Sequence, residues 1–163
     1  MSFSETYGPW AIVTGASSGI GRQFAHLLAE RGLNLIVTAR RSERLQELAV
    51  ELRDKNKVEV AVLALDLSAA ECLPPLLAAT EGRDIGLVVS NAGFGLKGKH
   101  HDQEAAQLDA MLNVNSRVPM LLSHAFAPRL IARGKGGLVI TSSIEGFVPF
   151  PMSGAYAASK AFV

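Results

Sequence analysis

The chain has 163 residues, of which 48% are hydrophobic and 19% are charged, and its formal net charge is +1. This composition is typical of a globular protein with a buried core, and it excludes a disordered chain. The near-neutral charge gives no basis for nucleic acid or a membrane surface as a partner, and no apolar run is long enough to span a bilayer. We expect one domain that covers residues 1–163.

The first residues and the single cysteine indicate the compartment in which the protein resides. The amino-terminal residues lack the basic and apolar regions of a secretory signal peptide. The one cysteine, Cys72, excludes an internal disulfide and is typical of a reducing compartment. We therefore expect a cytoplasmic protein, in which Cys72 is a packing or surface residue and not a nucleophile.

Apolar strands and amphipathic helices alternate along the whole chain, which predicts an α/β fold with a doubly wound parallel sheet. The third strand is apolar enough to predict burial on both of its faces. We expect the strand order 3-2-1-4-5, with a ligand across the carboxyl ends of the strands. The predicted strands are residues 9–14, 33–39, 58–65, 85–90 and 137–141.

The helices between these strands have recognisable start and stop signals. Ser42 is expected to cap the second helix, and Asp102 is expected to cap a long helix that extends to about residue 133. Pro119 and Pro128 predict a kink or a break within that long helix. The predicted helices are residues 22–31, from 42 onward, 69–80, 102–133 and 153–161.

A glycine-rich turn follows the first strand at once and leads directly into a helix. Its spacing is Gly-x-x-x-Gly-x-Gly over residues 15–21, and Ser17 and Ser18 add hydroxyl donors. Glycines allow the backbone to approach a pyrophosphate, while the helix N-terminus offers free N–H groups. The strand, turn and helix thus predict a dinucleotide site, although a glycine turn alone can also be a tight link.

Tyr156 and Lys160 are four residues apart in the last predicted helix, so they point the same way. An ammonium beside a phenol stabilises the phenolate form. Ser143 follows the fifth strand, where its hydroxyl could meet the phenol over a substrate oxygen. The alternative interpretation is a surface tyrosine and a surface lysine that share one helix face by chance.

Together, these motifs resemble the short-chain dehydrogenase/reductase family of the compact, non-extended type. The resemblance implies a Rossmann-like fold and hydride transfer between a nicotinamide and a carbonyl or secondary alcohol. Family members continue beyond the tyrosine helix with two further strands, so we expect these C-terminal strands to be missing here. The matching motifs are Thr14-Gly-x-x-x-Gly-x-Gly21, Asn91-Ala-Gly93, Asn115, Ser143 and Tyr156-x-x-x-Lys160.

The resemblance also implies roles for four catalytic residues. Tyr156 gives or takes the proton, and Ser143 orients the substrate oxygen. Lys160 holds the nicotinamide ribose and stabilises the phenolate. Asn115 opens its helix locally and holds a water molecule that links Lys160 to solvent.

The end of the second strand favours NADP over NAD as the cofactor. It has Arg40 and Arg41 and no carboxylate, and an arginine there accommodates the 2′-phosphate of NADP. Arg40 is the principal candidate and Arg41 is its possible assistant, although both could simply be solvated. The predicted cofactor site contains Gly15, Ser17, Ser18, Gly19, Ile20, Gly21, Arg40, Asp66, Leu67, Asn91, Ala92, Gly93, Tyr156 and Lys160.

Two of these assignments have structural alternatives. Asp66 could be a helix cap, and Asn91 is interpreted as more structural than catalytic. We expect no metal, because the four histidines lack ligand spacing with carboxylates or cysteines.

Two functions remain open. The first is an NADP-dependent oxidoreductase that acts on a small-molecule substrate and forms a homo-oligomer, as the resemblance implies. The second is a non-catalytic nucleotide-binding fragment of such an enzyme.

Overall fold

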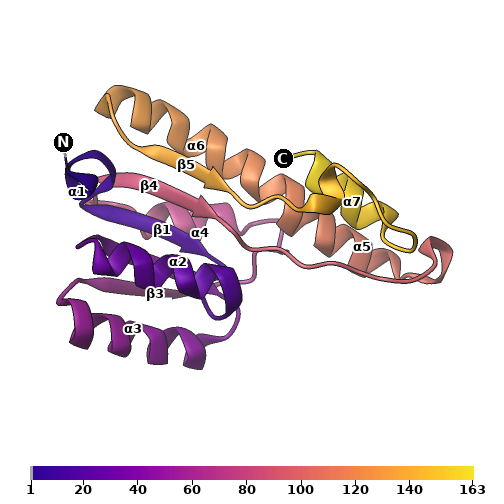
Figure 1. Cartoon of the computed structure of the whole chain (residues 1–163), viewed down its shortest axis with the longest axis horizontal. Coiled ribbons are helices and arrows are strands. Elements are labelled where there is room, and N and C mark those ends of the chain that lie inside the picture. The colour runs from indigo at the N-terminus through magenta and orange to yellow at the C-terminus, as the bar shows by residue number, and fades with distance from the viewer. Residues whose placement is uncertain (1) are drawn as a thin grey trace.

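The computed structural model describes residues 2–163 and contains a five-stranded parallel sheet (Figure 1). The strand order is β3-β2-β1-β4-β5, as the sequence predicts. The direction of winding reverses between β1 and β4, so a ligand site is expected at the carboxyl ends of these strands. The strands are β1 (Trp10–Thr14), β2 (Asn34–Ala39), β3 (Val60–Ala64), β4 (Ile85–Ser90) and β5 (Gly137–Ile140).

Helices cover both faces of the sheet (Figure 1). The helices are α1 (Phe3–Tyr7), α2 (Gly19–Glu30), α3 (Ser42–Asn56), α4 (Leu73–Ala78), α5 (Ala105–Leu112), α6 (Val118–Arg133) and α7 (Gly154–Ala161). Two 3₁₀ turns, η1 (His100–Asp102) and η3 (Ile144–Gly146), and a π-helical segment, η2 (Asn113–Arg117), complete the elements. None of the helices within residues 2–163 combines the length and apolar character needed to cross a membrane.

The strands contribute alternate residues to two hydrophobic cores. Val13 and Val37 pack with α2 and α3, whereas Ile12 and Ile36 pack on the opposite face with α4 and α6. Successive side chains of a strand point to opposite faces, so a continuous apolar strand serves both cores at once. Thus the central strands β1 and β2 are buried on both faces.

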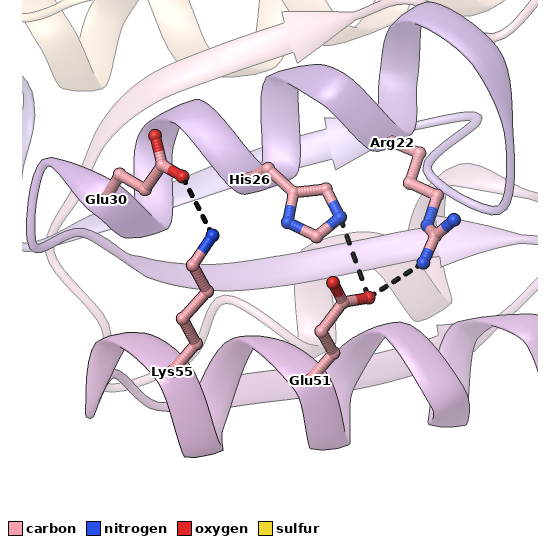
Figure 2. Close-up of polar contacts among 5 residues, drawn as sticks. All are labelled: Arg22, His26, Glu30, Glu51 and Lys55. Carbon is pink, nitrogen blue, oxygen red and sulfur yellow. Dashed lines mark hydrogen bonds and ion pairs between the residues drawn. The ribbon is translucent and has the colours of Figure 1, made fainter.

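Charged side chains join α2 to α3 at the surface (Figure 2). Glu51 accepts from Arg22 at 2.7 Å and lies 3.8 Å from His26, while Lys55 lies 3.3 Å from Glu30. Exposed pairs of this kind contribute only about 0–1 kcal/mol each. The apolar contacts beneath them are therefore the main attachment of these two helices.

Four local predictions differ from the structure. Ser42 is the first residue of α3 and makes no capping bond, and α4 is shorter than predicted because it begins just before its two prolines. Asp102 lies in η1, and Glu104 precedes the helix instead. In β3 only Val60 is buried, because this strand lies at an edge of the sheet.

The predicted long helix is interrupted, but at only one of the two prolines. The π-helical segment η2 ends immediately before α6, in which Pro119 is the second residue. Because Pro119 has no N–H, the carbonyl of Asn115 loses its usual helical partner, and the helix widens there. Pro128 lies inside α6, which continues through it.

Candidate functional site

A pocket of about 740 Å³ lies along the carboxyl ends of all five strands. It brings together most of the residues that the sequence predicts for the cofactor and for proton transfer. Gly21 and Asn115 are the predicted residues that do not line it. The predicted residues that do are Gly15, Ser17, Ser18, Gly19, Ile20, Arg40, Asp66, Leu67, Asn91, Ala92, Gly93, Ser143, Tyr156 and Lys160.

The glycine turn is packed so closely that side chains are excluded at two of its positions. A Cβ atom on Gly15, whose φ is +69°, would lie 2.9 Å from the Cα of Ala92. A Cβ atom on Gly21 would lie 2.4 Å from the carbonyl oxygen of Gly15. The turn leads directly into the N-terminus of α2. The first N–H groups of that helix have no partners within the helix.

Thr14 joins the glycine turn to the end of β4. Its hydroxyl accepts hydrogen bonds from the backbone N–H groups of Asn91 at 2.9 Å and Ala92 at 3.0 Å. The Asn91 side chain donates to the carbonyl oxygen of Thr14 at 3.1 Å. These contacts favour the structural interpretation of Asn91. Sequence reasoning gave Thr14 no role, although it directly precedes the first glycine.

Arg41, and not Arg40, contacts the serines of the glycine turn. Its Nη2 donates to the hydroxyl oxygens of Ser17 at 2.9 Å and Ser18 at 2.7 Å. Arg40 lines the same pocket, and after the hydrogen bonds from Ser68 its charge is a further cause that lowers the pKa of Asp66. Both arginines line the pocket, so the expectation that Arg40 is the principal phosphate contact stays a prediction.

Asp66 makes hydrogen bonds within a local turn after β3. It accepts hydrogen bonds from the backbone N–H of Ser68 at 2.9 Å and from the Ser68 hydroxyl at 2.8 Å. These bonds, the backbone one first, lower the pKa of Asp66. Asp66 is not a helix cap, because α4 begins only at Leu73 and its N-cap is Cys72. The carboxylate closes a local turn and lies at the pocket wall.

Ser143, Tyr156 and Lys160 lie at the other end of the pocket. Ser143 follows β5 and its hydroxyl accepts from the N–H of Glu145 at 3.2 Å. Tyr156 and Lys160 both belong to α7. Lys160 is only 5% exposed, its Nζ donates to the carbonyl oxygen of Thr141 at 2.8 Å, and burial lowers its pKa.

Asn115 lies behind the pocket wall and is almost completely buried. Its Oδ1 accepts from the N–H of Phe94 at 3.1 Å, and its Nδ2 donates to the Phe94 carbonyl at 2.9 Å. Nδ2 also donates to the Ser159 hydroxyl at 3.0 Å. Asn115 thus joins η2, the loop after β4 and α7, at the point where the helix is locally opened as predicted.

Sequence reasoning missed several residues that line this pocket. Phe94 directly follows Gly93, Ser142 directly precedes Ser143, and Thr141 directly follows β5. Position at the end of a strand is the signal that could have found them. Within residues 2–163, no group of three or more His, Cys, Asp or Glu is placed to hold a metal ion.

The pocket has the parts needed to bind a dinucleotide and to move a proton at a substrate oxygen. One end has a crowded glycine turn, a helix N-terminus and an arginine on serine hydroxyls. The other end has a serine, a tyrosine and a buried lysine. A nucleotide that lies along the strand ends would therefore bring its far half to these three side chains.

Known proteins are similar to this chain in sequence and in fold. The family described as short chain dehydrogenase matches residues 9–163. "Inactive hydroxysteroid dehydrogenase-like protein 1" from Pongo abelii is 37% identical over 162 residues, which are 98% of this chain and 49% of that protein.

Two solved structures are similar over nearly the whole chain. A structure of a 7beta-hydroxysteroid dehydrogenase has a TM-score of 0.95 at 34% identity, and covers 99% of this chain and 64% of its own. A short-chain dehydrogenase from Sphingobium yanoikuyae in complex with NADPH has a TM-score of 0.90 at 36% identity, with coverages of 96% and 61%. The present chain thus spans about half to two thirds of the length of these proteins. Sequence and fold agree that it belongs to the short chain dehydrogenase family.

Proposed function

We propose that the chain forms the cofactor-binding and proton-transfer part of an NADP-dependent oxidoreductase. The observation that carries this proposal is that Ser143, Tyr156 and Lys160 share one pocket with the glycine turn. The nicotinamide cofactor, when bound, supplies or receives the hydride. The substrate class is a carbonyl compound or the corresponding secondary alcohol.

The residues of the chain handle the substrate oxygen and its proton. The Ser143 hydroxyl hydrogen-bonds the substrate oxygen and orients it, and the Tyr156 hydroxyl gives the proton in reduction. Lys160 supplies a buried positive charge on the same helix, which favours the phenolate left on Tyr156. Asn115 holds the loop after β4 against α7 through its three hydrogen bonds.

The preference for NADP rests on the two arginines after β2. Arg41 is already placed on Ser17 and Ser18, and Arg40 lies beside it at the pocket wall. A charge-assisted contact to a phosphate contributes about 1.5–3 kcal/mol, which corresponds to roughly tenfold or more in affinity. This crowded, positively charged turn therefore suits a 2′-phosphate better than a free hydroxyl.

Fluorescence titration with NADPH and NADH tests the cofactor preference. We expect NADPH to bind at least about tenfold more tightly, and Arg41→Ala to remove most of that difference. Arg40→Ala should have a smaller effect, and Lys135→Ala, in the turn between α6 and β5, controls for the loss of one charge. Equal affinities of the parent protein for the two cofactors would reject the NADP preference.

The alternative is a non-catalytic nucleotide-binding protein, and one observation favours it. The Pongo abelii relative, 37% identical, is named as inactive. The decisive assay follows NADPH oxidation at 340 nm with acetophenone and with a 7-oxo steroid acid. In any form of the protein that turns over a ketone, we expect Tyr156→Phe nearly to abolish the turnover, while NADPH binding persists in that variant. NADPH binding without any turnover of either ketone would favour the alternative.

We further propose that the protein is cytoplasmic and forms a homo-oligomer. Its one cysteine, Cys72, is buried and free, which suits a reducing compartment. Exposed apolar side chains within residues 144–152 offer surface for a second copy.

A further inference from the structure

The loop after β4 has a glycine on each side of Phe94, and both glycines face the proton-transfer residues. A Cβ atom on Gly93 would lie 3.1 Å from the Nζ of Lys160 and 3.1 Å from the Oδ1 of Asn115. A Cβ atom on Gly95 would lie 3.2 Å from Cδ2 of Tyr156 and 3.4 Å from its Cγ. The loop backbone therefore lies directly against both side chains.

The conformation of Gly95 does not itself require glycine. Its φ lies outside the left-handed region, so an alanine would meet no backbone strain there. An added methyl group meets the Tyr156 ring, at a separation tighter than nine in ten real Cβ contacts. The Tyr156 ring can thus occupy its position only because residue 95 has no side chain.

The loop has little freedom to move away from the ring. The peptide of Phe94 is bound at both its N–H and its carbonyl by the side chain of Asn115. Asn115 also donates to the hydroxyl of Ser159, which in turn donates to the carbonyl oxygen of Tyr156 at 2.7 Å. One buried network thus fixes the loop and the tyrosine backbone relative to each other, so a new methyl group displaces the ring.

We propose that Gly95 is a positioning residue. Because it has no side chain, the backbone of the loop after β4 packs directly against the Tyr156 ring and determines the position of that ring. This inference rests on the proposed function, because the ring position matters only if Tyr156 transfers a proton. It goes beyond that function by assigning a role to a residue that touches neither cofactor nor substrate in the proposed mechanism. The hydroxyl at the far end of the ring is thereby aimed at the substrate oxygen.

The chain offers a matched control and a direct probe. A Cβ atom on Gly154, at the start of the helix that carries Tyr156, would meet nothing within 4 Å, and its φ is also outside the left-handed region. Gly154→Ala therefore adds the same methyl group without the contact. The sequence has only two tyrosines, so ¹³C-labelled tyrosine reports Tyr156 with Tyr7 as an internal reference.

In Gly95→Ala we expect the ring signals of Tyr156 to shift while those of Tyr7 stay in place. The ring has to give by a few tenths of an ångström. The kcat for the ketone that the parent protein reduces should therefore fall about 2- to 10-fold, less than the roughly 100-fold that a misplacement of about 1 Å can cause. The Kd for NADPH should stay within about twofold. Gly154→Ala should match the parent protein in kcat and in NADPH affinity.

Unmoved Tyr156 ring signals in Gly95→Ala would overturn the inference, and so would a shifted ring with an unchanged kcat. A loss of NADPH binding in Gly95→Ala would also overturn it, because that result indicates general damage to the fold. No turnover in the parent protein would reject the proposed function instead. In that case the ring signals still decide whether residue 95 sets the position of the phenol.

Discussion

Lys160 shows how a single charged residue can be buried at this site. Its ammonium group is 5% exposed and donates to the Thr141 carbonyl, which compensates part of the desolvation. The remaining cost lowers its pKa from the ordinary value of 10.5. The protein thus retains a positive charge near Tyr156 at the expense of stability.

That cost predicts a pH dependence of stability. Below pH 10.5 the unfolded chain keeps the Lys160 proton after the folded chain has released it, so the unfolded state binds more protons. The contribution of Lys160 to the free energy of unfolding therefore rises as the pH approaches 10.5. In Lys160→Met this rise should be absent, as urea unfolding at a series of alkaline pH values can measure.

Two comparisons isolate this effect. Burial raises the pKa of Cys72, which acts in the opposite direction at alkaline pH, but Cys72 is present in both proteins and cancels in their difference. The exposed Lys135 provides the control, because Lys135→Met should follow the pH profile of the parent protein. Parallel profiles for Lys160→Met and the parent protein would contradict the prediction.

At the scale of elements, the opened helix is the feature that connects the site. The π-helical segment η2 places Asn115 toward the loop after β4 and toward α7. In the same segment, Ser116 donates to the carbonyl oxygen of Ser159, and Ser142 after β5 donates to that of Lys160. Side chains from two other elements therefore hold α7 at its last turn, where helix carbonyls lack helical partners.

Removing the Asn115 side chain should destabilise the protein strongly. Asn115→Ala leaves the half-buried N–H and carbonyl of Phe94 without their partner and removes a buried amide, so we expect a loss of about 2–3 kcal/mol. Asn113→Ala, in the same segment, removes a half-buried amide that donates to the Ser68 carbonyl, and should cost less than about 1 kcal/mol. Urea unfolding of both variants measures the difference, and similar losses would argue against the special place of Asn115.

For the molecule as a whole, the distribution of exposed apolar side chains is uneven. Phe147 is 82% exposed, and four further exposed apolar residues lie within residues 144–152. Ile131 is also 77% exposed, but it belongs to a different element, α6. Contiguous exposed apolar surface of this kind marks interaction sites, so we expect a polypeptide of these 163 residues to self-associate.

Analytical ultracentrifugation of two variants identifies the surface that mediates association. The double variant Phe147→Ser/Phe150→Ser should shift the protein toward the monomer, because it removes two aromatic groups from the apolar segment. Ile131→Ser should leave the distribution unchanged. A monomeric parent protein would contradict the expectation of self-association, and an effect confined to Ile131→Ser would place the contact on α6.

Much of the fold and of the candidate site could be predicted from the sequence alone. The alternation of apolar strands and amphipathic helices predicted a doubly wound parallel sheet. The order usual for such a fold is the strand order that the structure shows. The glycine turn and the four-residue spacing of Tyr156 and Lys160 are also local signals, because steric limits and helix geometry act over a few residues. The carboxyl ends of the strands in a parallel sheet lie at one edge. Because the motifs follow successive strands, they were predicted to line a common pocket.

Only the tertiary structure decided which partners these residues have. Arg41 rather than Arg40 contacts the serines, because the turn after β2 sets the direction of each side chain relative to the glycine turn. β3 is half-exposed because its place at the sheet edge depends on pairing across the chain and not on its own apolar residues. The contact of Gly95 with Tyr156 joins residues 61 positions apart, and local patterns carry no information about such a contact until the sheet and α7 are in place.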